Sequence, residues 1–489
     1  MTRSTGRWTA PWEPGELSRD RRLSDPTGVQ YPVRVGQPTP ARPTSELRPP
    51  ARGGGGRRLL TVLFWAGLAI SLAVWWMGTP ASSVDSVGAA LNEAGRITGM
   101  VAGYTLLIQI LLMSRVGWLD RIVSANDLVL LHRDLGGLLV VAVLTHMATL
   151  IVGYAKLDEI SLWAETTTML SRLPDMISTF VATGLLVGVG LLAIRSVRSR
   201  LPYEVWYRLH LVSYGVLLFG YGHQFAAGRD LSNPGIARSY WLGLYAFVLA
   251  CLAWGRIVSL VRLNLRHRLR VAEIVLEGAD MFSIYVRGRR LDELNARAGQ
   301  YFRWRFLARG CWTQAHPFSL SAAPNERWLR LTVKAVGQHT ERLRRLRPGV
   351  RVIASGPSGA FTAARRQRHR ALLIAGGSGI APIRALLEDL PRGTVVVYRA
   401  STPDDVVFQE ELTWLARDRE AEIHYVIGSR DDPGPRRVMT PKGMRRLVPD
   451  VNRRDVYLCG PEGLVTAAVK LLRRLHVPRK QIHLDPFEF

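Results

Sequence analysis

The sequence predicts a multidomain membrane protein in which a six-helix transmembrane bundle precedes an antiparallel β-barrel and an α/β doubly wound domain. Three observations predict this order. Long apolar runs fill the chain between positions 59 and 262, short alternating segments follow from about 264, and strands alternate with helical stretches after about 370. The length of 489 residues is about three times that of a typical domain of ~150 residues, so several folded units are expected.

Six apolar stretches are each long enough to cross about 30 Å of hydrocarbon. They cover residues 59–78, 96–113, 127–154, 175–194, 204–225 and 239–261. Arginines cluster before the first stretch, in the second and fourth connections and after the sixth, whereas the other connections are richer in acidic residues. By the positive-inside rule we expect a multi-pass protein of the cell membrane with both termini in the cytoplasm and the lipid bilayer as a partner.

The net charge of +26 does not indicate a nucleic-acid partner. Only five of the 65 cationic residues are lysine, and this excess of arginine is typical of codon bias in a GC-rich bacterial genome. Cys251, Cys311 and Cys459 are too few and too scattered for a disulfide framework or a zinc site. Residues 1–56 are rich in proline, arginine and glycine and lack apolar periodicity, so we expect a disordered arm.

Four histidines lie within the third and fifth predicted helices: His132, His146, His210 and His223. On the third helix the two rings are separated by about 21 Å of rise and project from nearly the same face. Imidazole is an axial ligand of haem iron, so two facing helices with two imidazoles each would hold two stacked bis-histidine haems. We expect His132 to pair with His210 near the cytoplasm and His146 with His223 near the exterior.

The fifth helix fits this arrangement only if it is bent. Thirteen residues leave His210 and His223 about 140° apart on an ideal helix, so local unwinding is required. Three glycines would permit it: Gly215, Gly220 and Gly222. The alternative is that the histidines hydrogen-bond between helices without a metal. Arg96, at the outer end of the second helix, either neutralises a haem propionate, attracts an anionic acceptor or snorkels to water.

Beyond the membrane helices the pattern becomes that of strands. Alternating segments predict antiparallel strands of a small barrel at 271–276, 282–286 and 328–333. After about 370 the order is strand, helix, strand, helix, strand, at 371–375, 382–390, 394–398, 405–418 and 422–427. Such βαβ alternation predicts a parallel doubly wound sheet.

Two segments of the barrel region carry a family resemblance: His316-Pro-Phe-Ser-Leu-Ser321 and Val333-Lys-Ala-Val-Gly-Gln-His-Thr340. With them the chain resembles the ferric reductase and NADPH oxidase superfamily over about residues 90–489, and its second half is similar to ferredoxin-NADP reductase. The resemblance implies that Phe318 packs on the isoalloxazine of FAD, Ser319 hydrogen-bonds near N5 and His316 faces the phosphates. Soluble reductases have arginine in place of His316. Gly337 and Thr340 would meet the flavin pyrophosphate.

The residues that the resemblance assigns to FAD are His316, Pro317, Phe318, Ser319, Lys334, Gly337, His339 and Thr340. The alternative for either segment is an ordinary strand and turn. A terminal Phe487-Glu-Phe489 tail resembles the aromatic residue that stacks on flavin and moves aside for nicotinamide. By this resemblance Ser319, Cys459 and Phe489 are the residues closest to the chemistry.

The segment Leu373-Ile-Ala-Gly-Gly-Ser-Gly-Ile-Ala-Pro382 follows a predicted strand and opens a helix, which is the context in which a glycine loop brings pyrophosphate to a helix N-terminus. It is similar to the nicotinamide-binding half of the same family, as are Gly356-Pro-Ser-Gly359 and Tyr457-Leu-Cys-Gly-Pro-Glu462. The implied nicotinamide-binding residues are Gly376, Gly377, Ser378, Gly379, Cys459, Gly460 and Pro461. Cys459 is alternatively a small buried strand residue.

Arg399, Ser429 and Arg430 stand where relatives hold the ribose 2′-phosphate, which favours NADPH over NADH. The predicted domains are the arm 1–56, a ferric reductase-like transmembrane domain 57–262, an FAD-binding barrel 263–366 and an NAD(P)H-binding domain 367–489.

The resemblance implies an oxidoreductase that passes electrons from NADPH through FAD and two b-type haems to an acceptor outside, ferric chelate or dioxygen. Animal NADPH oxidases carry a further histidine one turn past the outer ligand, where this chain has Leu150, so ferric iron is the favoured acceptor. The alternatives are a superoxide-producing oxidase and a membrane-anchored flavin reductase or electron relay for a partner protein. The oligomeric state is left open.

Overall fold

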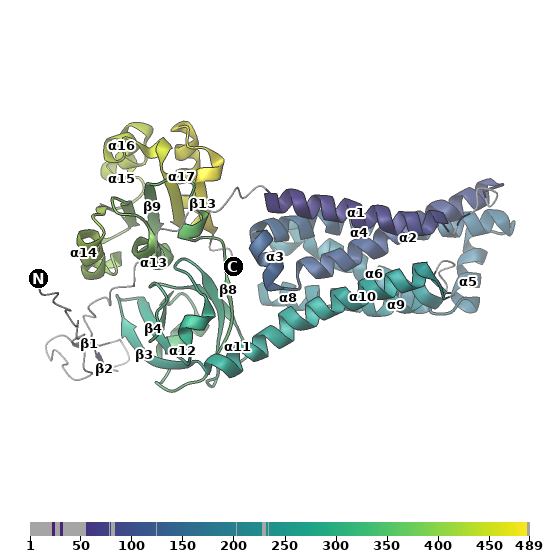
Figure 1. The fold of residues 1–489 in the computed structure, drawn as a ribbon, viewed down its shortest axis with the longest axis horizontal. Coiled ribbons are helices and arrows are strands. Elements are labelled where there is room, and N and C mark those ends of the chain that lie inside the picture. The colour runs from purple at the N-terminus through teal and green to yellow at the C-terminus, as the bar shows by residue number, and fades with distance from the viewer. Residues whose placement is uncertain are drawn as a thin grey trace, which may run out of the picture. The chain divides into compact units, whose positions relative to one another are not determined.

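The chain forms two compact units that meet in the sequence between Leu263 and Asn264 (Figure 1). The computed structural model describes residues 22–24, 30–32, 55–77, 79, 84–123, 125–201, 203–226, 231–232 and 234–486. Most of the predicted arm 1–56 and the whole tail 487–489 lie outside the described residues. Within the arm, β1 (Arg22–Ser24) pairs antiparallel with β2 (Gln30–Pro32). We call residues 55–263 the helical unit and 264–486 the strand-rich unit.

The helical unit consists of long apolar helices and shorter connecting ones. They are α1 (Gly55–Met77), α2 (Val87–Leu112), α3 (Gly117–Ile122), α4 (Ala125–Leu157), α5 (Leu162–Arg172), α6 (Met176–Ala193), α7 (Arg195–Arg198), α8 (Tyr203–Leu211), α9 (Ser213–Ala226), α10 (Ile236–Ala253) and α11 (Ser259–His267). A π-helical turn over Trp254–Val258 joins α10 to α11 in one helical run. Among the described residues five runs are long and apolar enough to cross a membrane: Arg58–Met77, Val87–Leu112, Asp127–Leu157, Met176–Ala193 and Ile236–His267. The chain is therefore a membrane protein.

The predicted fifth helix, over 204–225, contains the local unwinding that the histidine spacing required. The segment forms two helices, α8 and α9, because the chain leaves the α-helical hydrogen-bond ladder at Val212. There the Val212 N–H donates to the Leu209 carbonyl at 3.1 Å and the Gly215 N–H donates to the Val212 carbonyl at 2.8 Å, both of which are tight three-residue turns. Neither helix alone is long enough to span a bilayer, so five membrane-length helices are present in the described residues instead of six.

The first half of the strand-rich unit is a small antiparallel barrel. One sheet has the order β3 (Arg270–Leu276), β4 (Met281–Arg287), β7 (Leu329–Lys334), and the other has β6 (His316–Ser319), β5 (Tyr301–Phe306), β8 (Val352–Ser358). Isolated bridges at Arg270–Arg351 and Leu320–Leu331 connect the two sheets. A short helix, α12 (Gln338–Arg344), follows β7. The predicted antiparallel strands are confirmed within one residue at each end.

The second half is a five-stranded parallel sheet in the order β11-β10-β9-β12-β13. Its elements are β9 (Ala371–Gly376), α13 (Ile380–Asp389), β10 (Val395–Ala400), α14 (Gln409–Asp418), β11 (Glu422–Ile427), α15 (Pro433–Val438), α16 (Pro441–Leu447), β12 (Asp455–Gly460), α17 (Glu462–Arg474) and β13 (Ile482–Pro486). The central strands β9 and β12 are fully buried, as expected for parallel strands covered by helices on both faces. Connections leave β9 and β12 in opposite directions, so the carboxyl ends of these two strands form the switch point at which such sheets bind ligands.

Candidate functional site

The helical unit brings the four predicted histidines together in two pairs. The ring centroids of His132 and His210 lie 6.0 Å apart, and those of His146 and His223 lie 6.4 Å apart. Both members of each pair come from different helices, α4 on one side and α8 or α9 on the other. The structure thus pairs the same residues that helical spacing paired in the sequence.

These separations fit one metal ion between each pair of rings. With a metal–nitrogen bond of about 2.0 Å and a ring nitrogen about 1.1 Å from its centroid, two imidazoles on opposite sides of one ion place their centroids about 6.2 Å apart. At these separations, ring nitrogens that face each other are too far apart for a direct hydrogen bond. The rings are also not stacked, because their planes meet at 76° and 61°. Among the described residues no group of three or more His, Cys, Asp or Glu side chains that could hold a metal gathers, and each pair offers two imidazoles. Two imidazoles would suit haem iron, which brings four further nitrogens of its own.

Hydrogen bonding leaves one nitrogen of His146 available. Its Nδ1 lies 2.7 Å from the Gly95 carbonyl oxygen on α2, and a carbonyl only accepts, so Nδ1 carries the hydrogen and Nε2 is left with its lone pair. Metal-bound histidines are held in this way by a second partner. The Nδ1 atoms of His132, His210 and His223 are buried and have no hydrogen-bond partner in the part of the chain that the structure describes.

Close packing of α2 against α4 fixes the position of His146. A Cβ atom added at Gly99 would lie 2.7 Å from both Cε1 and Nδ1 of the His146 ring. One added at Gly95 would lie 2.6 Å from Cδ2 of Leu150. Glycine at these positions lets the two helices approach closely enough for a backbone carbonyl of α2 to accept from the imidazole.

An apolar layer separates the two histidine levels. Leu139 lies midway between the two histidines of α4, and Val216 lies midway between those of α8 and α9. Both are buried in one cluster whose other buried members are Ala102, Ala142 and Leu186. Saturated side chains at this depth exclude water from the space between the pairs.

Polar groups at the two ends of the bundle surround the pairs differently. Trp206 stacks on the His210 ring at 5.1 Å, and the Arg198 guanidinium lies over Trp206 at 4.8 Å. Arg96, which the sequence left as a propionate partner, an anion attractor or a snorkelling residue, instead forms an ion pair at 2.6 Å with Glu93. The Trp75 indole also donates to Glu93, at 3.1 Å. The pair is largely buried, so the Arg96 charge is already balanced.

Sequence reasoning missed Asp175 near the outer pair. It stands in the left-handed backbone region (φ 59°) at the start of α6, and its Oδ2 would lie 2.8 Å from a Cβ added at Gly222, next to His223. An acidic residue directly before an apolar helix is the signal that the sequence offered.

The predicted flavin-binding strand is β6. Trp304 on β5 donates from its indole to the Phe318 carbonyl at 3.0 Å and holds the strand in place. The His316 ring lies 4.2 Å from that of His339 and 6.3 Å from that of Phe318, centroid to centroid. Burial, followed by the charges of His316 and Arg342, lowers the pKa of His339 to about 4. The strand thus brings together three of the residues assigned to FAD.

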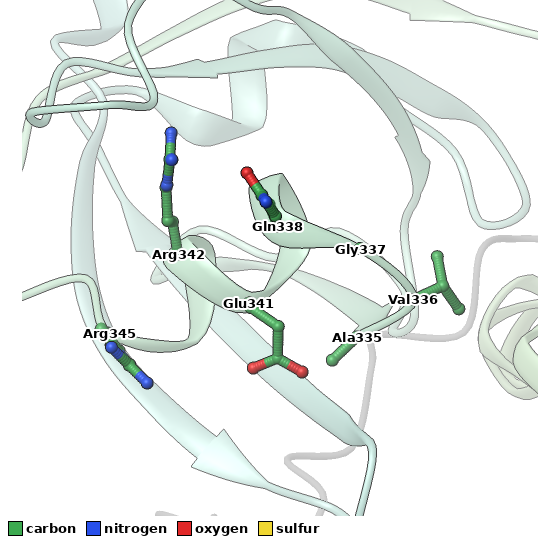
Figure 2. Close-up of a pocket in the computed structure, with 7 residues that line it drawn as sticks. All are labelled: Ala335, Val336, Gly337, Gln338, Glu341, Arg342 and Arg345. Atoms are coloured by element: carbon green, nitrogen blue, oxygen red, sulfur yellow. The ribbon is translucent and has the colours of Figure 1, made fainter. Parts of the chain in front are cut away.

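Three further predicted FAD residues lie at the end of β7 and in the turn into α12: Lys334, Gly337 and Thr340. The Thr340 hydroxyl accepts from the Val336 and Gly337 N–H groups, each at 3.0 Å, so these amides are engaged in shaping the turn. Lys334 forms an ion pair with Asp280 at 3.0 Å. A pocket opens beside this loop, and Figure 2 shows Gln338 and Arg342 on one side of α12 with Glu341 and Arg345 on the other. Its lining residues are Ala335, Val336, Gly337, Gln338, Glu341, Arg342 and Arg345.

The glycine loop lies at the switch point of the parallel sheet. It follows β9 as a 3-10 turn over Gly377–Gly379, with Gly377 in the left-handed region (φ 53°). A Cβ added at Gly379 would lie 2.3 Å from the Cys459 carbonyl oxygen at the end of β12, so only glycine fits there. The loop and the Cys459-Gly460-Pro461 segment therefore lie together, as the sequence predicted for a nicotinamide site.

A buried cluster joins this loop region to the flavin-binding strand. The Ser319 hydroxyl donates to Oδ2 of Asp485 at 3.3 Å, and the Cys459 thiol donates to the Asp485 carbonyl at 3.4 Å. Burial raises the pKa of the Cys459 thiol. Burial also raises the pKa of Asp485 to about 6, against the opposing effect of the Ser319 hydrogen bond. Asp485 was missed because no acid or base was sought, although an acidic residue in register with Cys459 on a neighbouring parallel strand could have been noticed.

The predicted 2′-phosphate residues lie at the same edge of the sheet. Arg399 on β10 donates to the Ala400 and Val426 carbonyls, each at 2.8 Å, and burial lowers its pKa. Arg430 is exposed and lies 3.8 Å from Asp431. The Ser429 N–H donates to Asp432 at 2.5 Å. Phe489 lies outside the described residues, and its predicted stacking stays a prediction.

Three family models match successive parts of the chain. One described as a ferric reductase like transmembrane component matches residues 98–221, one described as an FAD-binding domain matches 266–362, and one described as an oxidoreductase NAD-binding domain matches 373–470. The chain has the ferric reductase/NADPH oxidase-type architecture. Its second half matches the models of an FAD-binding domain and an oxidoreductase NAD-binding domain.

Similar proteins match parts of this architecture. The reductase component of propane 2-monooxygenase from Rhodococcus jostii is 31% identical over 151 residues, which is 28% of this chain and 41% of that protein. Ferredoxin-NADP reductase B from Sorangium cellulosum is 29% identical over 188 residues, 35% of this chain and 77% of that protein. The structure of the FAD/NAD-binding domain of nitric oxide dioxygenase from Vibrio cholerae is 24% identical, covers 45% of this chain and 98% of its own, and has a TM-score of 0.38. The chain thus spans less than half of the first of these relatives.

The raised pKa of Asp485 generates a prediction about pH. We expect the rate at which NADPH reduces bound FAD to fall as pH rises through about 6, because ionised Asp485 adds negative charge beside Ser319, the residue that the family resemblance places near N5 of the flavin. Asp485→Asn keeps the hydrogen bond from Ser319 without ionising, so its rate should be flat over the same range. Anaerobic stopped-flow mixing across about pH 5 to 8 checks this. A wild-type rate with no inflection near pH 6 contradicts it, as does the same inflection in the variant.

Proposed function

We propose that the protein carries electrons from cytoplasmic NADPH through FAD and two b-type haems to an acceptor on the outer face of the cell membrane, most favourably ferric iron. The observation that carries this proposal is the pair of ring-centroid distances, 6.0 and 6.4 Å, at two levels of one apolar bundle. Bound FAD and haem together supply the conversion of a two-electron donor into single electrons, which side chains do not perform.

The break at Val212 supports a sixth crossing made of α8 and α9 together. An unbroken helix would set His210 and His223 about 140° apart. The turn allows both rings to face α4, and α8 and α9 together cover 23 residues, enough to span the hydrocarbon. Six crossings with both termini in the cytoplasm follow from this assignment and the arginine distribution.

The residues of this chain have positioning roles in the proposed reaction. His132 and His210 hold the inner haem, and His146 and His223 hold the outer one. Ser319 and Phe318 orient FAD, the Gly376–Gly379 turn admits the NADPH pyrophosphate, and the buried Cys459 lies at the end of β12 where the nicotinamide ring would rest. The Leu139 and Val216 layer excludes water between the haems.

Two contacts at the outer level favour ferric iron over dioxygen as the acceptor. Leu150 packs against Gly95, so α4 presents an apolar side chain one turn beyond His146. The Arg96 guanidinium is paired with Glu93 and does not offer a free positive charge to a nascent anion such as superoxide. Within the described residues, an apolar Leu150 and a paired Arg96 at this level suit direct transfer to a bound chelate.

Haem content tests the histidine assignment. The purified protein should show b-type bands in a reduced-minus-oxidised spectrum, and His146→Ala should keep about half of the haem because one of two sites is lost. Gly99→Ala, which adds a methyl group 2.7 Å from the His146 ring without altering a ligand, should also lose haem from the outer site. The matched control is Gly243→Ala on α10, where an added Cβ meets nothing within 4 Å. Full haem content in both His146→Ala and Gly99→Ala rejects the assignment.

Product analysis tests the acceptor. With NADPH and a ferric chelate, we expect ferrous chelate to account for most of the NADPH consumed and to form equally well without oxygen, because no oxygen site is required. Superoxide formation that matches NADPH consumption would instead establish the oxidase alternative. Reduction of neither acceptor by haem-loaded protein would favour an electron relay for a partner protein.

A further inference from the structure

A buried cluster of charges joins the barrel to the parallel-sheet domain within the strand-rich unit. Arg330 on β7 is only 2% exposed and makes a two-pronged pair with Glu411 on α14, through Nη1 to Oε1 at 2.7 Å and Nη2 to Oε2 at 2.9 Å. The Nε of Arg384, on α13, lies 2.7 Å from the same Oε2. One carboxylate is therefore shared by two arginines from different domains. We call Arg330, Glu411 and Arg384 the interdomain triad.

The triad holds the barrel segment that follows the flavin-binding strand. Arg330 donates from Nη2 to the Ser321 carbonyl at 2.8 Å and from Nε to the Ser321 hydroxyl at 3.1 Å. Arg384 donates to the same carbonyl at 3.4 Å and forms an ion pair with Glu388. Glu388 in turn accepts from the Ala323 N–H at 2.9 Å. Residues 321–323 are thus held by groups from α13 as well as from β7.

This charged cluster contributes more to the relative placement of the two domains than to the stability of the fold. Burial alone would raise the pKa of Glu411, but the charges of Arg330 and Arg384 outweigh it and lower the pKa to about 2, so the carboxylate is ionised at neutral pH. A buried charge network of this kind contributes little stability compared with apolar packing of the same volume. Hydrogen bonds between guanidinium and carboxylate groups form only in particular directions. Such a network therefore specifies one relative placement of the elements that it joins.

The elements joined are those on which the proposed hydride transfer depends. Ser321 stands two residues beyond Ser319, and Arg384 lies in the first turns of α13, which starts directly after the Gly376–Gly379 turn. Donor and acceptor atoms must approach to about 3–3.5 Å, and a misplacement of about 1 Å costs on the order of a hundredfold in rate. A link between these two segments therefore controls the distance over which the hydride moves.

We propose that Arg330, Glu411 and Arg384 are positioning residues that fix the flavin-binding strand against the nicotinamide-binding loop, so that they govern the rate of hydride transfer without contacting either cofactor. This inference rests on the proposed function in that FAD and NADPH are taken to bind at those two segments. A triad that served folding alone would affect stability and cofactor content before it affected the transfer step.

The test compares Glu411→Gln with the matched variant Asp450→Asn in the full-length, FAD-loaded protein. Asp450 pairs with the largely buried Arg454 at 2.7 Å, but both residues lie within the parallel-sheet domain. Anaerobic stopped-flow mixing with NADPH gives the rate of FAD reduction and the Kd for NADPH, and 4-deuterated NADPH gives the isotope effect on the step. We expect Glu411→Gln to slow reduction by about tenfold or more with an increased isotope effect, unchanged FAD content and a Kd within about twofold of wild type. Asp450→Asn should match wild type.

Three outcomes overturn the inference: FAD reduction at the wild-type rate in Glu411→Gln, slowing that follows loss of FAD or of NADPH affinity, and equal slowing in Asp450→Asn. If Glu411→Gln does not fold, Glu411→Asp, which keeps the charge but shortens the side chain, carries the same expectation and the same refutation. Failure of the wild-type protein itself to reduce FAD with NADPH would reject the proposed function, whereas a normal Glu411 variant beside an active wild type would reject only the triad.

Discussion

The placement of four half-buried imidazoles in two facing pairs is the constraint on which the helical unit depends. A buried polar group without a partner costs about 1–3 kcal/mol, and three of the four Nδ1 atoms lack one in the described part of the chain. Haem iron, bound as we propose, would be held by the opposite ring nitrogens, and the observed separations of 6.0 and 6.4 Å leave room for it. The close α2–α4 packing, the turn at Val212 and the apolar layer around Leu139 surround the rings in this arrangement.

In the strand-rich unit the comparable constraint is the relative placement of the barrel and the parallel-sheet domain. Its site is assembled where the carboxyl ends of parallel strands meet the edge of a barrel strand, so the relative placement of two domains decides the chemistry. The Ser319 hydroxyl donates to Asp485 between the barrel and the parallel-sheet domain, and the Arg330–Glu411 ion pair joins the same two domains. Glycine at 379 is required because the loop passes close to the Cys459 carbonyl, which brings the two nucleotide-facing segments together.

Much of the fold was predictable from the periodicity of apolar residues and from the positions of glycine and proline. Apolar runs located the five membrane-length helices of the described residues, period-two alternation located the barrel strands, and the glycine loop was correctly placed between a buried strand and a helix. The similar spacings, 14 residues from His132 to His146 and 13 from His210 to His223, were sufficient to predict which rings would pair.

What the sequence could not reveal depends on contacts between distant segments. The histidine spacing indicated a bend near Gly215, Gly220 or Gly222, but its position at Val212, three residues before Gly215, has no local signal, because valine is common in membrane helices. The pairing of Arg96 with Glu93 satisfies a charge that appeared free in the sequence, and the Thr340 hydroxyl is engaged with its own turn. Asp485 and the Arg330–Glu411–Arg384 triad gain their importance only when β13, β7, α13 and α14 are brought together.

The stoichiometry and ligation of haem in the purified full-length protein test the central claim most directly. Pyridine haemochrome analysis against FAD content, combined with low-temperature electron paramagnetic resonance of the oxidised protein, counts the irons and reports their ligands. Two haems per FAD, both low-spin as two imidazoles require, is the predicted result. A protein that binds FAD but holds no haem, or holds only high-spin iron, contradicts it.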